Sequence, residues 1–213
     1  MKNFLLSIAI FLFFSAKSFG HVDHYSNFNY LEYELLRNNK PIGYHKFEFT
    51  RKGEKLTIKS EVKFKITKLG VDLYQYFANS EENYLKGIFQ SYYSKTKQNK
   101  KDRYVNINFS DSENSLIIDG SSYKGKANKD FIVGTWWNHE IIKAKAQISG
   151  ISGRIIEQTV KFIGKEDVTI NGKTYKTLHF NFKSSDETLP ESKKLNTDIW
   201  YEEDSFLWVK ASF

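Results

Sequence analysis

The sequence predicts an all-β fold: a strongly curved antiparallel sheet of about ten strands that forms a half-barrel or a barrel. Apolar and polar residues alternate with a period of two along many segments, as in strands with one buried and one wet face. Turn-forming residues separate these segments, and the whole chain contains only two prolines. A two-sheet sandwich is the alternative that this pattern leaves open.

The N-terminal half shows the clearest alternation. From Leu56 to Ile66 every even position is apolar except Ser60, and the odd positions are Thr, Lys or Glu. The same pattern predicts strands over 31–35, 45–49 and 105–109. Residues 69–93 carry aromatic side chains at both parities, so we expect strands that are covered on both faces or that bend.

A second set of strands follows in the C-terminal half. Asn171-Gly172 predicts a tight hairpin turn between strands at 168–170 and 175–182. A last hairpin is expected to pair 198–201 with 206–212, after a polar exposed loop over 184–194. Between the two sets, residues 130–150 predict a short helical or irregular connection, with Asn138 as a helix cap.

The N-terminus has the pattern of a cleavable secretory signal peptide, residues 1–20. Lys2 precedes an apolar run over 4–14, and Ser18-Phe19-Gly20 supplies small residues for a signal peptidase. The run is shorter than a bilayer-spanning helix, although an uncleaved anchor is the alternative. We therefore expect a periplasmic or secreted protein that starts near His21. Residues 21–213 would form a single β domain with no transmembrane segment.

Composition narrows the function classes. The chain has no Cys, so an exported protein would have neither disulfides nor thiol chemistry. The formal charge of +7 becomes +5 without Lys2 and Lys17, which is compatible with anionic head groups or other polyanions. Export argues against nucleic acid as a partner. Lys59, Lys63 and Lys65 share one strand face, which reads as a solvated outer face or as a docking patch for head groups.

Trp136-Trp137-Asn138-His139 is the most unusual local feature. Two adjacent Trp residues on a connection can line a ligand mouth, where they would stack on sugars or contact acyl chains. In the structural interpretation one Trp plugs an open end of the barrel and the other is half exposed, since large aromatic residues most often serve protein cores.

The histidines offer few catalytic options. His45 has the parity of Phe47 and Phe49 and should face inward, whereas His179 has the opposite parity to Phe180 and should face solvent. No nucleophile motif, phosphate loop or metalloprotease motif accompanies them, so we predict no catalytic residues and no cofactor. His21, Asp23 and His24 near the new N-terminus are a weak candidate for copper or zinc.

The order of several short motifs resembles a family of exported bacterial proteins of unknown function built on curved antiparallel sheets. The motifs are Ile42-Gly43, Trp136-Trp137-Asn138, the Gly150–Gly153 segment, Asn171-Gly172-Lys173 and Asp198-Ile199-Trp200-Tyr201, and the match covers about residues 28–213. The architecture is also loosely similar to that of periplasmic lipoprotein carriers, whose half-barrels shelter acyl chains. The resemblance implies a fold and supplies no catalytic residues.

We therefore expect a non-enzymatic periplasmic protein that binds a lipid-like or other apolar ligand in its β-barrel cavity. The tentative ligand-binding residues are Trp136, Trp137, His45, Phe47, Phe49, Phe64 and Trp200, with Tyr33, Val62 and Phe180 also lining the cavity. The alternative is an envelope glycan-binding protein or glycan-acting enzyme that uses Trp136 and Trp137 as stacking platforms with acids such as Asp198 or Glu202. A purely structural envelope protein is the third possibility.

Overall fold

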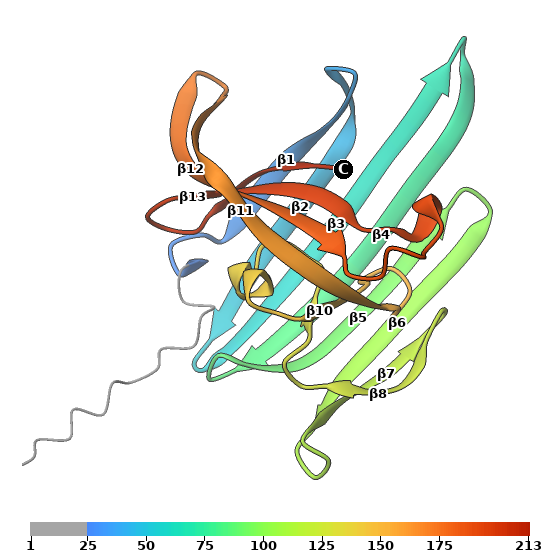
Figure 1. Cartoon of the computed structure of the whole chain (residues 1–213), viewed down its shortest axis with the longest axis vertical. Helices are drawn as coiled ribbons and strands as arrows, with labels where there is room; N and C mark the ends of the chain where they lie inside the picture. The colour runs from blue at the N-terminus through green and yellow to red at the C-terminus, as the bar shows by residue number, and fades with distance from the viewer. Residues whose placement is uncertain (1–24) are drawn as a thin grey trace, which may run out of the picture.

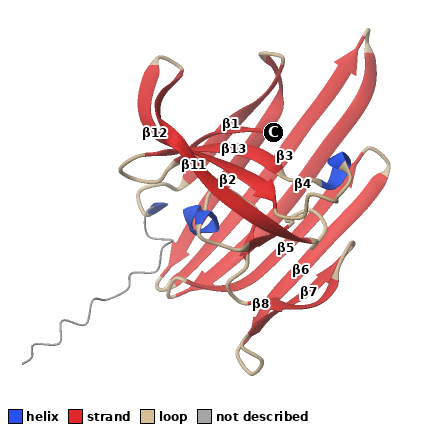
Figure 2. Cartoon of the chain, viewed as in Figure 1, coloured by secondary structure: helices blue, strands red, loops and turns tan. Residues whose placement is uncertain are grey.

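The computed structural model describes residues 25–213, and within them it confirms the all-β fold (Figures 1 and 2). The expected signal peptide and the candidate metal ligands His21, Asp23 and His24 lie outside the described residues. Two sheets face each other and are not closed into a barrel, so the half-barrel form of the prediction holds. They contain eight and six strands, more than the sequence pattern indicated.

The first sheet is an antiparallel meander in which neighbouring strands follow one another along the chain. Its strands are β1 (Tyr30–Arg37), β2 (Lys40–Lys52), β3 (Lys55–Lys68), β4 (Val71–Leu85), β5 (Ile88–Gln98), β6 (Lys101–Ser110), β7 (Ser115–Gly120) and β8 (Lys124–Asn128). The strands predicted over 31–35, 45–49, 56–66 and 105–109 are all present. The aromatic segment 69–93 forms β4 and β5, and its outward rings Phe77 and Tyr93 are exposed.

The second sheet has the order β14-β13-β12-β11-β10-β9. Its strands are β9 (Ile132–Val133), β10 (Ala146–Ile148), β11 (Ile155–Ile170), β12 (Lys173–Ser184), β13 (Asn196–Glu202) and β14 (Trp208–Ser212). β9 pairs with β10 in parallel, and the other pairs are antiparallel. The hairpin predicted at Asn171-Gly172 joins β11 to β12. A single turn of 3₁₀ helix, η3 (Glu191–Lys193), lies in the predicted polar loop.

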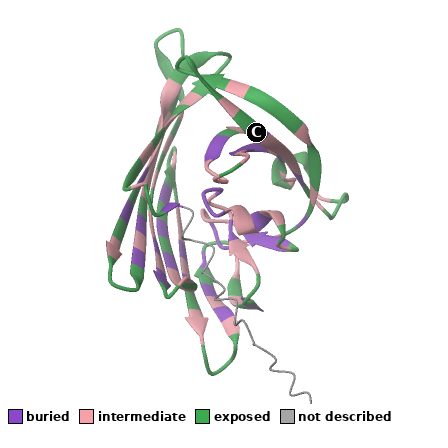
Figure 3. Cartoon of the chain, turned by 90° about the vertical axis from the view of Figure 1, so that its left-hand side faces the viewer, coloured by how far each residue is buried: buried purple, intermediate pink, exposed green. Residues whose placement is uncertain are grey.

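The connection between the two sets of strands packs between the sheets. It contains β9, β10 and the 3₁₀ helix η2 (His139–Ile142), and the Asn138 side chain caps η2 by accepting a hydrogen bond from the Glu140 amide, as predicted. The Gly150 carbonyl accepts hydrogen bonds from Tyr92 and Ser94 of β5, at 3.1 and 2.5 Å. Figure 3 shows the buried residues concentrated on this connection and on the strand faces around it.

The register of β2 to β6 arranges the inward side chains of the first sheet in rows. One row near the β2–β3 and β4–β5 turns is bulky and buried, and it contains Phe49, Ile58, Glu82, Tyr92 and Ile107. The next two rows have small side chains in their middle: Ser60, Ser80 and Ser94, then Val62, Ala78 and Thr96. Above them Phe64 pairs with Tyr76. The inner face therefore changes from bulky to small to aromatic along the strands.

A close approach between β2 and β3 requires glycine at position 43. A Cβ atom there would lie 2.0 Å from the Lys63 carbonyl oxygen and 2.5 Å from the Phe64 Cα atom. Both neighbours are backbone atoms, so they cannot move without disturbing the ladder.

We predict that Gly43→Ala lowers the free energy of unfolding by about 1–3 kcal/mol, because the added methyl group overpacks the strand pair. Gly164→Ala is the matched control, since nothing lies within 4 Å of its Cβ position and its φ is not left-handed. Urea denaturation followed by circular dichroism measures both changes. Equal stability of the two variants would contradict the predicted clash.

Candidate functional site

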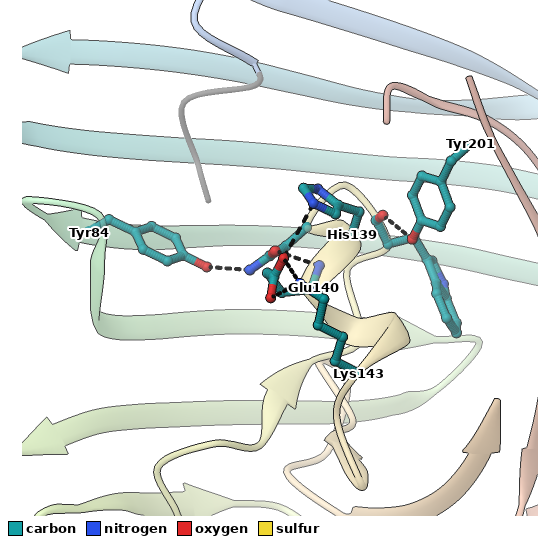
Figure 4. Close-up of polar contacts among 7 residues, drawn as sticks. Tyr84, His139, Glu140, Lys143 and Tyr201 are labelled. Atoms are coloured by element: carbon teal, nitrogen blue, oxygen red, sulfur yellow. Dashed lines mark hydrogen bonds and ion pairs between the residues drawn. The ribbon is translucent and has the colours of Figure 1, made fainter. Parts of the chain in front are cut away.

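Residues Trp136, Trp137 and Asn138 are held between the two sheets. The Tyr84 hydroxyl, on β4, accepts a hydrogen bond from the Asn138 amide at 3.4 Å. The Tyr201 hydroxyl, on β13, donates to the Trp136 carbonyl at 2.8 Å. Figure 4 shows these two tyrosines reaching the connection from opposite sides. Trp136 has a left-handed φ of 64°, an uncommon conformation for a bulky residue that these contacts hold in place.

Both Trp side chains are buried in protein. Trp137 has no exposed surface, and its ring meets Tyr25, Phe49 and Tyr84 edge to face at 5.7–5.8 Å. Trp136 packs edge to face on Phe182 at 5.2 Å. The prediction that these rings line a ligand mouth or a glycan platform is therefore wrong. The structural interpretation is right that the rings serve the core and wrong that one of them is half exposed, because both are buried.

A carboxyl group lies in the middle of this aromatic cluster. Glu82, on β4, is 2% exposed and accepts hydrogen bonds from the Tyr84 hydroxyl at 2.5 Å and the Trp137 indole at 2.9 Å. Burial raises the pKa of Glu82 to about 7, and the hydrogen bonds oppose that rise. The sequence analysis missed this residue, although its parity with Ser80 and Tyr84 places it on the inward face.

Other rings expected to line the cavity also pack against protein. Phe47 and Phe49 are buried side by side, with centroids 6.2 Å apart. Tyr33 stacks near Trp208 at 4.3 Å and donates a hydrogen bond to its carbonyl at 2.8 Å. The lower interior between the sheets is thus filled by the protein's own side chains.

His45 faces inward as predicted. It lies 4.2 Å from the Phe47 ring and 5.8 Å from the Trp208 ring, and its Nε2 atom shares a hydrogen bond with Ser60 at 3.0 Å. Burial lowers the pKa of His45 to about 3, so the imidazole is neutral at ordinary pH. A base this weak is not suited to activating Ser60.

The small residues above the buried row retain accessible surface. Ser60, Val62, Ala78 and Ser80 face inward and are only half-buried, whereas the row below them is buried. We call these four side chains the small-residue patch. Above it, Phe64 stacks on Tyr76 at 4.9 Å and on Tyr74 at 5.7 Å, and all three rings are half-buried. Among the predicted cavity residues, Val62 and Phe64 belong to this open region.

The second sheet adds apolar surface to the same interior. Phe180 faces inward from β12 and packs against the edge of the buried core. Its cross-strand partner Phe162 lies 5.3 Å away and is 51% exposed. Two sheets therefore present aromatic rings with accessible surface beyond the filled part of the interior.

Trp200 is on the wrong face for the predicted cavity. The register places it opposite His179, on the face away from Phe180, Ile199 and Tyr201. There it stacks on His179 at 4.2 Å, under the ammonium group of Lys210 at 4.3 Å, and its indole donates a hydrogen bond to Glu166. Trp200 and Tyr201 are both buried, although they point to opposite faces of β13.

The acids named for a glycan-acting enzyme accept hydrogen bonds from neighbouring residues of the second sheet. Asp198 accepts hydrogen bonds from His179 at 2.9 Å and Asn181 at 3.0 Å. Glu202 accepts from the Ser205 amide and hydroxyl in the β13–β14 turn. Among the described residues, no three His, Asp or Glu side chains group so as to hold a metal ion.

A separate surface cleft of about 520 Å³ lies where β4 meets β5. Its apolar lining comes from Leu85, Ile88, Phe89, Phe109 and Leu116, and its charged lining from Lys86, Asp111, Lys129 and Asp130. Both signs of charge are represented, so the cleft has no evident preference for an anion or a cation. None of the ligand-binding residues predicted from the sequence lines this cleft.

Comparison with known proteins gives a family but no activity. The model of a domain of unknown function, DUF6134, matches residues 33–213. No curated protein matches the chain. A crystal structure of a beta-barrel-like protein of domain of unknown function DUF1849 from Brucella abortus aligns with a TM-score of 0.48 and 11% identity, covering 86% of this chain and 96% of that one. Within residues 25–213, no helix is long and apolar enough to cross a bilayer.

The raised pKa of Glu82 predicts a pH-dependent stability. The folded protein retains a proton that the unfolded chain releases near pH 4.5, so the free energy of unfolding falls as pH rises from about 4.5 to 7. We expect Glu82→Gln to remove this fall. Above pH 7 its free energy of unfolding should exceed that of the wild type by up to about 3 kcal/mol. Urea denaturation at pH 4 to 8 measures it. Glu81→Gln on the same strand is the control, and a wild-type curve with the same slope as E82Q would contradict the assignment.

The lowered pKa of His45 predicts the opposite slope. The unfolded chain binds a proton near pH 6.5 that the folded protein rejects until about pH 3, so stability is lost as pH falls below 6.5. We expect His45→Phe to keep the ring contacts and to remove an acid-side loss of stability of about 5 kcal/mol. The same denaturation series measures it. If H45F and E82Q changed the slope in the same direction, one of the two assignments would be wrong.

Proposed function

Because the chain belongs to the DUF6134 family, whose description assigns no activity, we propose its function from the geometry: it binds a lipid-like, apolar ligand between its two sheets. The observation that carries the proposal is the small-residue patch, Ser60, Val62, Ala78 and Ser80, which faces the interior and retains accessible surface. Small side chains in the middle of a concave sheet leave room that larger residues would fill.

The surroundings of the patch suit a hydrocarbon chain. The aromatic rings Phe64, Tyr74 and Tyr76 lie above it, and Phe162 and Phe180 lie on the second sheet. The hydroxyls of Ser60 and Ser80 provide a few polar contacts, as in most pockets for apolar ligands. The buried row lies directly beside the patch and is filled by protein side chains. The proposed ligand site is therefore smaller than the predicted cavity and lies nearer the β3–β4 turn.

We further propose that this binding is non-enzymatic and takes place outside the cytoplasm. The signal-peptide pattern of residues 1–20 supports export. Among residues 25–213, Glu82 is the buried carboxyl near the Trp residues, and its hydrogen-bond donors enclose it. Trp136 and Trp137 are buried and cannot stack on a sugar, so no observation favours the glycan alternative.

Filling the patch tests the proposal. We expect Ala78→Trp to weaken binding of 11-(dansylamino)undecanoic acid by about tenfold or more, because the indole would occupy the space of the ligand chain. Fluorescence titration of the purified protein measures the dissociation constant. Asn79→Trp is the matched control, since residue 79 is the next position on β4 and is exposed on the outer face.

Two outcomes would overturn the proposal. The first is a wild-type protein that gives no saturable change in probe fluorescence. The second is A78W and N79W variants that bind the probe equally well while both retain wild-type circular dichroism spectra. Ser80→Leu is a smaller filling change at the neighbouring inward position, and it keeps the test informative if A78W fails to fold.

A further inference from the structure

The hairpin tip between β3 and β4 carries unusually exposed apolar side chains. Leu69 is 95% exposed, Val71 is 62% exposed and Leu73 is 55% exposed. Figure 1 shows this hairpin extending beyond the neighbouring strands, so its tip stands clear of the rest of the molecule. These three side chains, which we call the apolar tip, contribute nothing to the buried core.

Leu69, at the turn, adopts a backbone conformation that leucine disfavours. Leu69 has a φ of 51° and Gly70 a φ of 77°, a turn that favours Asn-Gly. At the corresponding left-handed positions of other hairpins the chain carries Asn38, Lys86, Asn99 and Asn171, which are all polar. A leucine in this conformation is strained and, at 95% exposure, gains no packing in return. Such a local conflict indicates a role other than folding.

Positive charge surrounds the apolar tip. In an antiparallel meander, alternate turns lie at the same end of the sheet, so the β1–β2, β3–β4 and β5–β6 turns share one end. The basic residues in and beside these turns are Arg37, Lys40, Lys63, Lys65, Lys68, Lys97, Lys100 and Lys101, and the acids are Glu34, Asp72 and Asp102. Lys65 pairs with Asp72 at 2.9 Å, which leaves a clear basic excess.

We propose that this end of the first sheet docks on an anionic phospholipid bilayer, with the apolar tip inserted among the lipids and the lysines on the head groups. A narrow convex tip offers little area to a protein partner, which needs a flat or complementary face. A fluid bilayer requires no such complementarity. Burial of a few apolar side chains among the lipids, beside basic side chains on the head groups, stabilises binding. The docking does not depend on the ligand proposed above, although Tyr74 and Phe64 lie on the same hairpin.

Vesicle binding tests the proposal with the full chain and a turn-preserving variant. Leu69→Asn/Val71→Thr removes the apolar tip, while Asn suits the left-handed position and Thr suits a strand. We expect the wild type to sediment with vesicles of phosphatidylcholine and phosphatidylglycerol and to bind pure phosphatidylcholine weakly. The variant should lose about tenfold or more in partition constant, and binding should weaken at high salt.

The matched control lies at the other end of the same sheet. Leu85→Thr/Ile88→Thr removes apolar side chains that are 45% and 58% exposed beside the β4–β5 turn, and it should bind as the wild type does. The wild type and both variants carry the same N-terminal residues, so any contribution of those residues to vesicle binding is the same in all three proteins. The proposal fails if L69N/V71T binds as well as the wild type, or if the control loses as much. It also fails if size-exclusion chromatography shows that the tip mediates self-association instead.

Discussion

The packing of Trp137 against the inward face of β4 is the contact on which the rest of the structure depends. The indole is fully buried, meets three aromatic rings and donates its hydrogen bond to Glu82. Burying a ring of this size stabilises strongly, but the indole N–H must find an acceptor in an apolar surrounding. Glu82 supplies it, and the same burial raises the pKa of its carboxyl to about 7.

This contact fixes the connection, and the connection fixes the two sheets. Tyr84 of the first sheet and Tyr201 of the second hold Trp136 and Asn138 from opposite sides, so neither sheet has to close on itself into a barrel. The connection fills the interior beside the buried row of the first sheet. It leaves the side chains of the small-residue patch only half-buried. The proposed ligand site is therefore a consequence of where the connection ends.

The two proposals assign different binding roles to two parts of the β3–β4 hairpin, its inner face and its tip. The inner face carries small residues and half-buried rings, which suit an apolar chain, and the tip carries exposed apolar residues among lysines, which suit a charged bilayer. Together they describe a protein that could meet a membrane and accept an apolar molecule from it. The two sites are tested separately, because the tip variants leave the inner face unchanged.

Much of the architecture was determined by the sequence alone. The period of two specified the strands and the inward face of His45, and Asn171-Gly172 specified a hairpin, because these depend on local backbone geometry. Asn138 was identified as a cap for the same reason. The inward parity of Glu82 was also readable, although its environment was not.

Only the tertiary structure decided which inward rings are covered and which remain accessible. Parity says that Phe47, Phe49 and Phe64 face inward, but not that the connection buries the first two and stops short of the third. Adjacent Trp200 and Tyr201 point to opposite faces of β13, but only the pairing of Trp200 with His179 and of Tyr201 with Leu178 shows which of the two faces inward. Burial of Trp136 and Trp137 likewise depends on residues from both sheets, which meet only when the chain folds.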